Sequence, residues 1–205
     1  MMMTMSKKTW ISALLLAGAS LAQAAAVVGQ PAPAFSITDS QGKTVSLADY
    51  KGKHVVLEWV NPGCPFVKKH YDSGNMPATQ KSAADKGVVW LAVSSTAKSA
   101  SDYLAPPQLD AWLSSKQAAL KATLMDDDGK LGRAYGARTT PHMYVIDPAG
   151  TLVYAGAIDS KPTANPADIK TATNYVSQAL GEALAGKPVS RPNSTAYGCT
   201  IKYAS

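Results

Sequence analysis

Runs of apolar residues alternate along the chain with segments that have the spacing of amphipathic helices. Residues 55–60 and 88–93 are almost continuously apolar, which is typical of central strands buried on both faces. Two further apolar runs, 142–146 and 151–155, flank the turn sequence Asp-Pro-Ala-Gly and predict a β-hairpin. A second hairpin is predicted within 35–47, around the sequence Ser-Gln-Gly.

Helices are predicted between these strands and after them. The shorter ones are expected from 64 to beyond 69, at 75–86, at 108–115, near 121 and at 129–135. One long helix is predicted to begin after Asn165, which is a suitable N-cap followed by Pro166, and to end at Gly186. The order βαβ, helix, hairpin, helix indicates an α/β domain with a mixed sheet.

Composition narrows the classes of protein that fit this pattern. Hydrophobic residues make up 46% of the 205 residues and charged residues 17%, so the chain can form one packed domain. The net charge is +6, but the basic residues are scattered, and we expect no nucleic-acid partner. Two cysteines exclude a disulfide-dense scaffold and a four-cysteine zinc site, and no cofactor is expected.

Residues 1–24 have the features of a secretory signal peptide. Lys7 and Lys8 precede an apolar stretch, and Ala22 and Ala24 place small residues where a signal peptidase reads. The stretch is short for a bilayer span, and an uncleaved anchor helix is the alternative. Cleavage would leave 181 residues with a net charge of +4. We therefore expect an exported, periplasmic or otherwise extracytoplasmic protein with no stable membrane anchor.

The main candidate for chemistry is Cys64, which follows the first central strand. Pro62 and Gly63 break that strand, so Cys64 is expected at the start of the next helix, where Pro65 suits the first turn. The positive end of the helix dipole and free backbone N–H groups would lower the pKa of the Cys64 thiol and favour its thiolate. The position of Cys64 at a helix start is weak evidence by itself, and a buried, unreactive cysteine is the alternative.

Two motifs resemble the thioredoxin fold. The segment Val55–Val67 resembles its active-site strand and turn, and Thr139–Pro141, ahead of an apolar strand, resembles its cis-proline turn. The motif Cys-Pro-Phe-Val is closest to the peroxiredoxin-like branch of the redoxin (alkyl hydroperoxide reductase/thiol-specific antioxidant) families, whose C-terminal end resembles residues 197–203. The resemblance covers about residues 29–203. It implies a thioredoxin-like fold: a mixed central sheet flanked by helices, an N-terminal β-hairpin and an extended tail.

The resemblance also implies roles for single residues. Cys64 corresponds to the attacking cysteine, whereas Val67 replaces the resolving cysteine of thioredoxin. Glu58 corresponds to a buried acid that transfers protons, and burial would raise its pKa. A carboxylate paired with a lysine, or exposed at the sheet edge, is the alternative for Glu58. The residues assigned to substrate binding are Thr140, Pro141 and Pro65.

The chain lacks the residues that activate peroxide in true peroxiredoxins. Those proteins have a proline seven residues and a threonine three residues before the reactive cysteine, where this chain has Leu57 and Asn61. Their active-site arginine has no clear counterpart, because Arg138 is offset. Asn61 is retained as a candidate catalytic residue, since its amide could donate a hydrogen bond to a peroxide.

Cys199 is the one cysteine of the chain that can pair with Cys64. It lies in a predicted tail, residues 189–205, that follows a domain predicted at 25–188. Residues 189–198 can span at most about 35 Å, enough to cross such a domain. The composition of residues 191–195 is typical of an open linker. We interpret Cys199 as a resolving cysteine; a permanent structural disulfide, or no intramolecular bond, are the alternatives.

The sequence therefore predicts an exported thiol oxidoreductase or thiol peroxidase-like antioxidant protein. Cys64 would attack a disulfide-bearing protein or a peroxide, Cys199 would resolve the adduct, and an external dithiol would reduce the enzyme. The alternative is a non-catalytic thioredoxin-fold module that binds a peptide or a metal and has a structural disulfide. The three histidines show no ligand spacing, and His70, which follows two lysines, is expected to be solvated.

Overall fold

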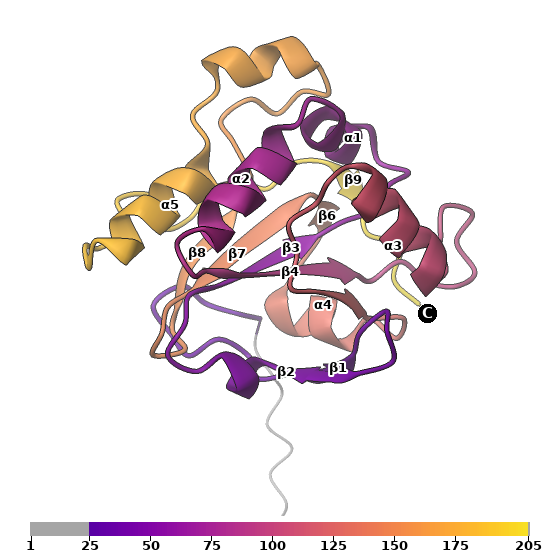
Figure 1. The fold of residues 1–205 in the computed structure, drawn as a ribbon, viewed down its shortest axis with the longest axis horizontal. Helices are drawn as coiled ribbons and strands as arrows, with labels where there is room; N and C mark the ends of the chain where they lie inside the picture. Colours follow the sequence, from indigo (N-terminus) through magenta and orange to yellow (C-terminus); the bar gives the residue numbers. More distant parts are fainter. Residues whose placement is uncertain (1–24, 205) are drawn as a thin grey trace, which may run out of the picture.

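A five-stranded mixed sheet forms the centre of the protein (Figure 1). The computed structural model describes residues 25–204. In the order β5-β4-β3-β7-β8, the strands are Ala122–Met125, Val89–Ser94, Val55–Trp59, His142–Ile146 and Leu152–Gly156. β3 pairs in parallel with β4 and antiparallel with β7. Every residue of β3 and β4 is buried, as their continuous apolar sequences predicted.

Helices cover both faces of the sheet. α1 (Pro65–Asp72), α2 (Asn75–Ala84), α3 (Pro106–Ser115) and α5 (Tyr175–Leu184) lie on one face (Figure 1). α4 (Lys130–Tyr135) lies on the other face, together with the hairpin of β1 (Ser36–Thr38) and β2 (Thr44–Ser46). This arrangement confirms the predicted α/β architecture with an N-terminal hairpin.

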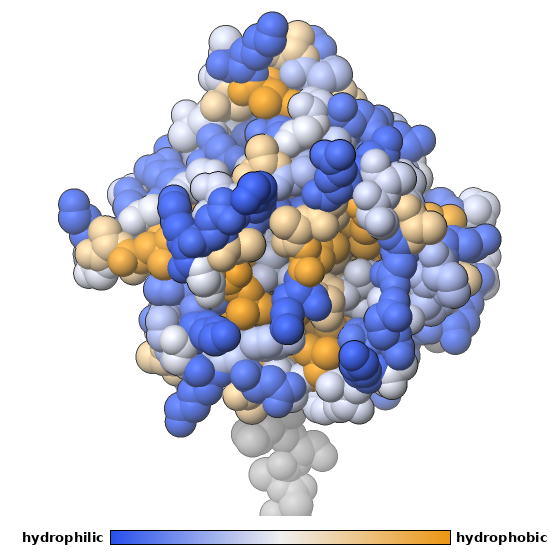
Figure 2. Space-filling model, viewed as in Figure 1, coloured by the Kyte–Doolittle hydropathy of each residue, from blue (hydrophilic) through white to orange (hydrophobic). Residues whose placement is uncertain are grey.

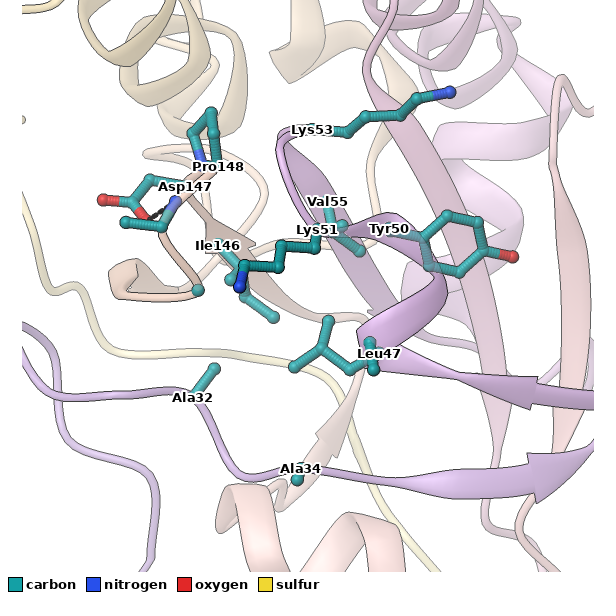
Figure 3. A pocket seen from close by; sticks show the side chains of 13 residues that line it. Ala32, Ala34, Leu47, Tyr50, Lys51, Lys53, Val55, Ile146, Asp147 and Pro148 are labelled. Atoms are coloured by element: carbon teal, nitrogen blue, oxygen red, sulfur yellow. Dashed lines mark hydrogen bonds between the residues drawn. The ribbon is translucent and has the colours of Figure 1, made fainter.

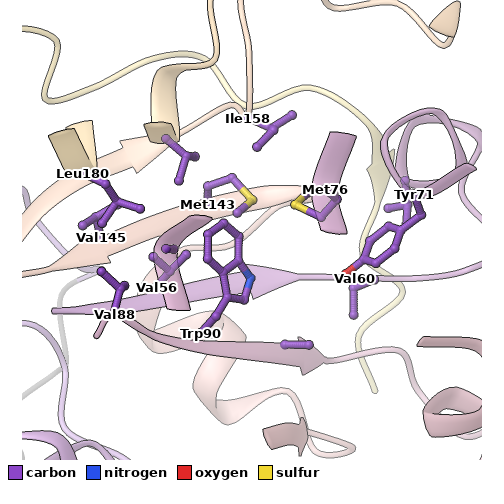
Figure 4. Close-up of a cluster of buried hydrophobic side chains, with 14 of the residues drawn as sticks. Val56, Val60, Tyr71, Met76, Val88, Trp90, Met143, Val145, Ile158 and Leu180 are labelled. Atoms are coloured by element: carbon purple, nitrogen blue, oxygen red, sulfur yellow. The ribbon is translucent and has the colours of Figure 1, made fainter. Parts of the chain in front are cut away.

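Each face of the sheet has its own core because neighbouring residues of a strand point to opposite sides. Val56 and Trp90 point toward α1, α2 and α5 (Figure 4). Their core also includes Met143 of β7, Met76 of α2 and Leu180 of α5. Leu57 and Trp59 point to the other side, toward α4. Among the described residues, the large hydrophobic side chains left exposed are Val27 and Leu184. The apolar patches of the face drawn in Figure 2 are accordingly small and separated by hydrophilic residues.

Two sequence predictions of helices are wrong. The long helix predicted from Asn165 to Gly186 is interrupted: a 3-10 helix, Pro166–Thr171, is followed by a break and then by α5. The break occurs because Asn174 pairs with Asp159 in a β-bridge and caps α5 instead of continuing the earlier turns. The helix predicted near 121 is the strand β5, which pairs with β4.

The start of the chain lies outside the described residues, and so does the predicted signal peptide, residues 1–24. Within residues 25–204, none of the helices has the length and hydrophobicity that a membrane span requires. An apolar pocket lies between the 3-10 helix Leu47–Tyr50 and the β7–β8 turn (Figure 3). It adjoins Val55, where β3 begins, whereas Cys64 follows the other end of β3, so the pocket is separate from the site below.

Candidate active site

Cys64 lies where β3 ends and α1 begins. The Asn61 Oδ1 atom accepts a hydrogen bond from the Gly63 N–H at 2.7 Å, and Asn61 Nδ2 donates to Thr96 Oγ1 at 3.0 Å. These bonds hold the turn that presents Cys64 as the N-cap of α1, with Pro65 at the first helical position. The sulfur therefore lies at the positive end of the helix dipole, as the sequence predicted. Asn61 is buried and supports this turn.

Cys64 forms a disulfide with Cys199, 135 positions later in the chain. The two Cα atoms are 5.8 Å apart, within the usual range for a disulfide. Cys64 is 2% exposed, whereas Cys199 is only partly buried. The carbonyl oxygen of Thr140 lies 3.0 Å from Cys64 Sγ, and the Thr140–Pro141 peptide bond is cis. The structure thus brings together both cysteines and the cis-proline turn, while Pro65 is exposed beside them.

The tail forms a short strand along the cis-proline turn. β6 (Thr139–Thr140) and β9 (Cys199–Thr200) are antiparallel, with Thr140 opposite Cys199. Gly198 has a φ of +141°, and a Cβ atom there would collide with the Thr140 carbonyl oxygen. The tail therefore pairs with the backbone of Thr140, a residue that the resemblance assigned to substrate binding.

The prediction of an open linker ahead of Cys199 is wrong, because backbone hydrogen bonds join this segment to β8. The Ala155 N–H donates to Pro192 O, and the Ser194 N–H donates to Ala155 O, both at 3.1 Å. Beyond Cys199, the Ile201 N–H donates to Arg138 O at 3.0 Å. Linker-like composition did not predict these contacts, since backbone groups of any residue can make them. The tail is therefore anchored on both sides of Cys199.

Glu58 is fully buried on β3 and is bound by three uncharged donors. Its Oε1 atom accepts from the Tyr71 hydroxyl at 2.8 Å, and its Oε2 atom accepts from Gln80 Nε2 at 2.9 Å and from Trp90 Nε1 at 2.8 Å. Burial raises the pKa of Glu58 to about 7, although the three hydrogen bonds oppose this shift. Glu58 is thus neither paired with a lysine nor exposed, and with a pKa of about 7 both its protonated and its charged form are present near neutral pH.

A second polar cluster, which the sequence analysis did not predict, lies against α1, the helix that Cys64 caps. It consists of Lys69, His70, Asp159 and Tyr197. The prediction that His70 is solvated is wrong, because His70 is completely buried beneath the tail. The one signal in the sequence was the spacing of Phe66, Lys69 and His70, which places them on one face of α1.

The described part of the chain holds no group of three or more histidine, cysteine, aspartate or glutamate side chains that could bind a metal ion.

Comparisons with known proteins agree with this geometry. Residues 28–155 match the AhpC/TSA family. A curated relative, the thiol-disulfide oxidoreductase ResA of Bacillus thuringiensis subsp. konkukian, is 25% identical over 127 residues, which are 62% of this chain and 67% of the relative. A hypothetical protein of Sinorhizobium meliloti 1021 superposes with a TM-score of 0.73 at 22% identity, covering 89% of this chain and 97% of the other.

The thioredoxin domain of a thiol-disulfide oxidoreductase from Bacteroides vulgatus superposes with a TM-score of 0.50. It is 26% identical and covers 63% of this chain and 87% of its own. These likenesses confirm the thioredoxin-like fold that the two sequence motifs predicted.

Proposed function

Because the chain belongs to the AhpC/TSA family, we propose that it is a thiol-disulfide oxidoreductase whose Cys64 and Cys199 alternate between dithiol and disulfide. The observation that carries this proposal is the Cys64–Cys199 disulfide, at the start of α1 and beside the cis-proline turn. A helix N-terminus favours the thiolate of a reduced cysteine, and the thiolate is the form that attacks disulfides.

The cycle has three exchange steps. The Cys64 thiolate attacks one sulfur of a substrate disulfide, forms a mixed disulfide and releases the other substrate sulfur as a thiolate. The Cys199 thiolate then attacks Cys64 Sγ, which closes the Cys64–Cys199 disulfide and releases the second substrate thiolate. An external dithiol reduces this disulfide and is itself oxidised, so two electrons pass from the dithiol to the substrate.

A protein disulfide is the substrate class that the contacts favour. β6 pairs with an extended segment whose cysteine stands beside Cys64, and a substrate strand with a cysteine can bind this edge in the same way. A peroxide is less favoured, because the hydrogen bonds to Thr96 and Gly63 hold the buried Asn61 amide, the candidate donor, in the turn before α1. Thr140 and Pro141 would then bind substrate, and Glu58 would supply or accept protons.

The two sulfurs differ in access, and this difference assigns the reductant to Cys199. Cys64 is almost completely covered, whereas Cys199 is partly exposed. The attacking thiolate of the dithiol would reach Cys199 first, and Cys64 would leave as the thiolate that the helix favours. Substrate can reach Cys64 only after the reduced tail has moved away from β6.

An extracytoplasmic location suits this chemistry, because disulfides persist there and are rare in the cytoplasm. Lys7, Lys8 and the apolar stretch that follows them support export by a signal peptide.

One observation favours the alternative of a non-catalytic module with a structural disulfide. The tail is hydrogen-bonded to β8 before Cys199 and to Arg138 after it, so it has no obvious freedom to leave. A disulfide that closes a long loop also stabilises a fold without any catalytic role.

Turnover of insulin disulfides separates these functions when a dithiol donor is supplied. The wild-type protein should reduce insulin repeatedly, and Cys64→Ser should not react. Cys199→Ser should attack once per molecule and stop, with a mixed disulfide on Cys64 that is visible by mass spectrometry. Repeated turnover by Cys199→Ser would refute the resolving role.

Matched assays with hydrogen peroxide test the substrate class. Peroxide consumption without insulin reduction would reassign the substrate, whereas a wild-type disulfide that resists the dithiol would support the structural alternative.

A further inference from the structure

A tyrosine of the tail is held in a buried, charged site two residues before Cys199. The Tyr197 hydroxyl donates a hydrogen bond to Asp159 Oδ1 at 2.5 Å and lies 3.1 Å from His70 Nε2. Lys69 Nζ lies 3.6 Å from Asp159 Oδ2. Lys69, His70 and Asp159 are each at most 3% exposed. These three residues are called the Tyr197 site below.

The ring of Tyr197 packs against the helix that begins at Cys64. Its centroid is 5.8 Å from that of Phe66, and Lys69 Nζ lies 5.5 Å from it. Phe66, Lys69 and His70 are spaced i, i+3 and i+4, so they present one surface of α1. The same helix therefore carries the reactive sulfur and the surface that receives the tail.

The hydrogen bonds around His70 fix the direction in which the Tyr197 hydroxyl donates. Asn75 Nδ2 donates to His70 Nδ1 at 2.8 Å, so the His70 proton is on Nε2 and is donated to the Tyr197 oxygen. The hydroxyl proton is then free to be donated to Asp159. Burial lowers the pKa of His70 to about 4, and burial together with Asp159 raises the pKa of Tyr197, so both are uncharged at neutral pH.

The buried charges favour the docked tail. A buried ion pair is stable only when hydrogen bonds replace the lost water around it. Among the described residues, Asp159 Oδ2 has no hydrogen-bond partner, and Asp159 Oδ1 accepts from Tyr197 and from the Lys161 N–H. If Tyr197 left, the carboxylate would lose one of its two hydrogen bonds while still facing Lys69.

Because Tyr197 is only two residues before Cys199, binding of Tyr197 also restricts the position of Cys199. Gly198 is the single residue between Tyr197 and Cys199, and it lies so near the Thr140 carbonyl that a side chain would not fit. With Tyr197 bound and β9 paired to β6, Cys199 has little freedom and stands opposite Thr140, next to Cys64.

We propose that Lys69, His70 and Asp159 form a binding site for the Tyr197 hydroxyl, and that Tyr197 is a positioning residue for Cys199. When Tyr197 is bound, Cys199 is in range to close the disulfide on Cys64. When it leaves, the tail frees β6 and Cys64 for substrate. This inference deepens the proposed function, because it names the contact that controls the resolving step.

Amide hydrogen exchange of the reduced full-length protein tests the proposal. The Ile201 N–H donates to Arg138 O while the tail is docked, so its exchange rate reports undocking. Tyr197→Phe removes only the hydroxyl. We expect exchange at Ile201 to become about tenfold faster or more, because hydrogen bonds to charged groups are roughly twice as strong as neutral ones. In a glutathione redox buffer, the Cys64–Cys199 equilibrium should shift toward the dithiol.

Tyr203→Phe is the matched control. It removes a hydroxyl from the same tail, but that hydroxyl donates to the uncharged carbonyl of Ala137 at 2.7 Å. Its effect on both measurements should be clearly smaller. In an Asp159→Asn background, the effect of Tyr197→Phe should shrink as well. Equal effects of Tyr197→Phe and Tyr203→Phe, or no change in either measurement, would overturn the proposal.

Neither measurement needs a substrate, so the Tyr197 site and the proposed function can be rejected independently of each other. A shift in Tyr197→Phe without any insulin reduction by the wild type would support the Tyr197 site and reject the catalytic cycle. Normal turnover without any shift would reject the Tyr197 site and leave the cycle intact.

Discussion

At the scale of single residues, Glu58 is a carboxyl group that the fold buries without a cation. Burial raises its pKa from 4.5 to about 7. Between these pH values the folded protein holds a proton that the unfolded chain has lost, so the contribution of Glu58 to stability falls as the pH rises. A difference of about 2.5 pKa units corresponds to about 3 kcal/mol.

Glu58→Gln should remove this pH dependence. Measured by urea unfolding, the stability of the wild type relative to the variant should fall by about 3 kcal/mol between pH 4.5 and pH 7.5. His70 and His142, whose pKa values burial lowers to about 4, contribute the opposite slope, but they do so in both proteins and cancel in the difference. Parallel stability curves would contradict the raised pKa.

Some of these residues could be recognised from the sequence and others could not. Cys64, Glu58 and Pro141 lie in two short motifs, so their neighbours along the chain identify them. Tyr197 and Asp159 are 38 positions apart and meet on α1 only after folding. No local pattern connects them, because a buried charge cluster depends on which distant segments pack together.

At the scale of elements, β9 is a two-residue strand that only a glycine can precede. The Gly198 φ of +141° and its contact with the Thr140 backbone both exclude a side chain. Sequence periodicity cannot reveal so short a strand, because two residues carry no alternation. Sequence periodicity also did not predict the break before α5. The apolar face continues through this break, but the β-bridge between Asp159 and Asn174 changes the direction of the chain.

Gly198→Ala should therefore prevent β9 from pairing with β6. We expect the Cys64–Cys199 equilibrium in a glutathione buffer to shift at least tenfold toward the dithiol, while the domain remains folded by circular dichroism. Gly150→Ala is the control, because Gly150 also has a positive φ, +88°, but has open space around it. A shift of the same size in Gly150→Ala would contradict the steric argument.

At the scale of the whole molecule, the disulfide joins the first helix after the central strand to the end of the chain. Cys199→Ser removes a bond between residues 135 positions apart. The chain-entropy model limits the resulting loss of stability to about 4–5 kcal/mol. Apart from Ile201, the buried residues of both cores lie outside the tail. We therefore expect the variant to unfold in one cooperative transition at a lower temperature in calorimetry. Failure to fold would favour a purely structural disulfide.

The pairing of β9 with β6 also has a consequence for encounters between molecules. Every copy of the chain carries both the receiving edge and a tail that fits it. Two reduced molecules can therefore exchange tails, and each Cys64 then closes on the other copy's cysteine, a form of domain swapping. Swapped and unswapped forms contain the same bonds. The swapped form is therefore favoured only when the protein concentration exceeds the effective concentration of a molecule's own tail at its own β6. Oxidation in concentrated solution favours covalent dimers, and oxidation in dilute solution favours monomers.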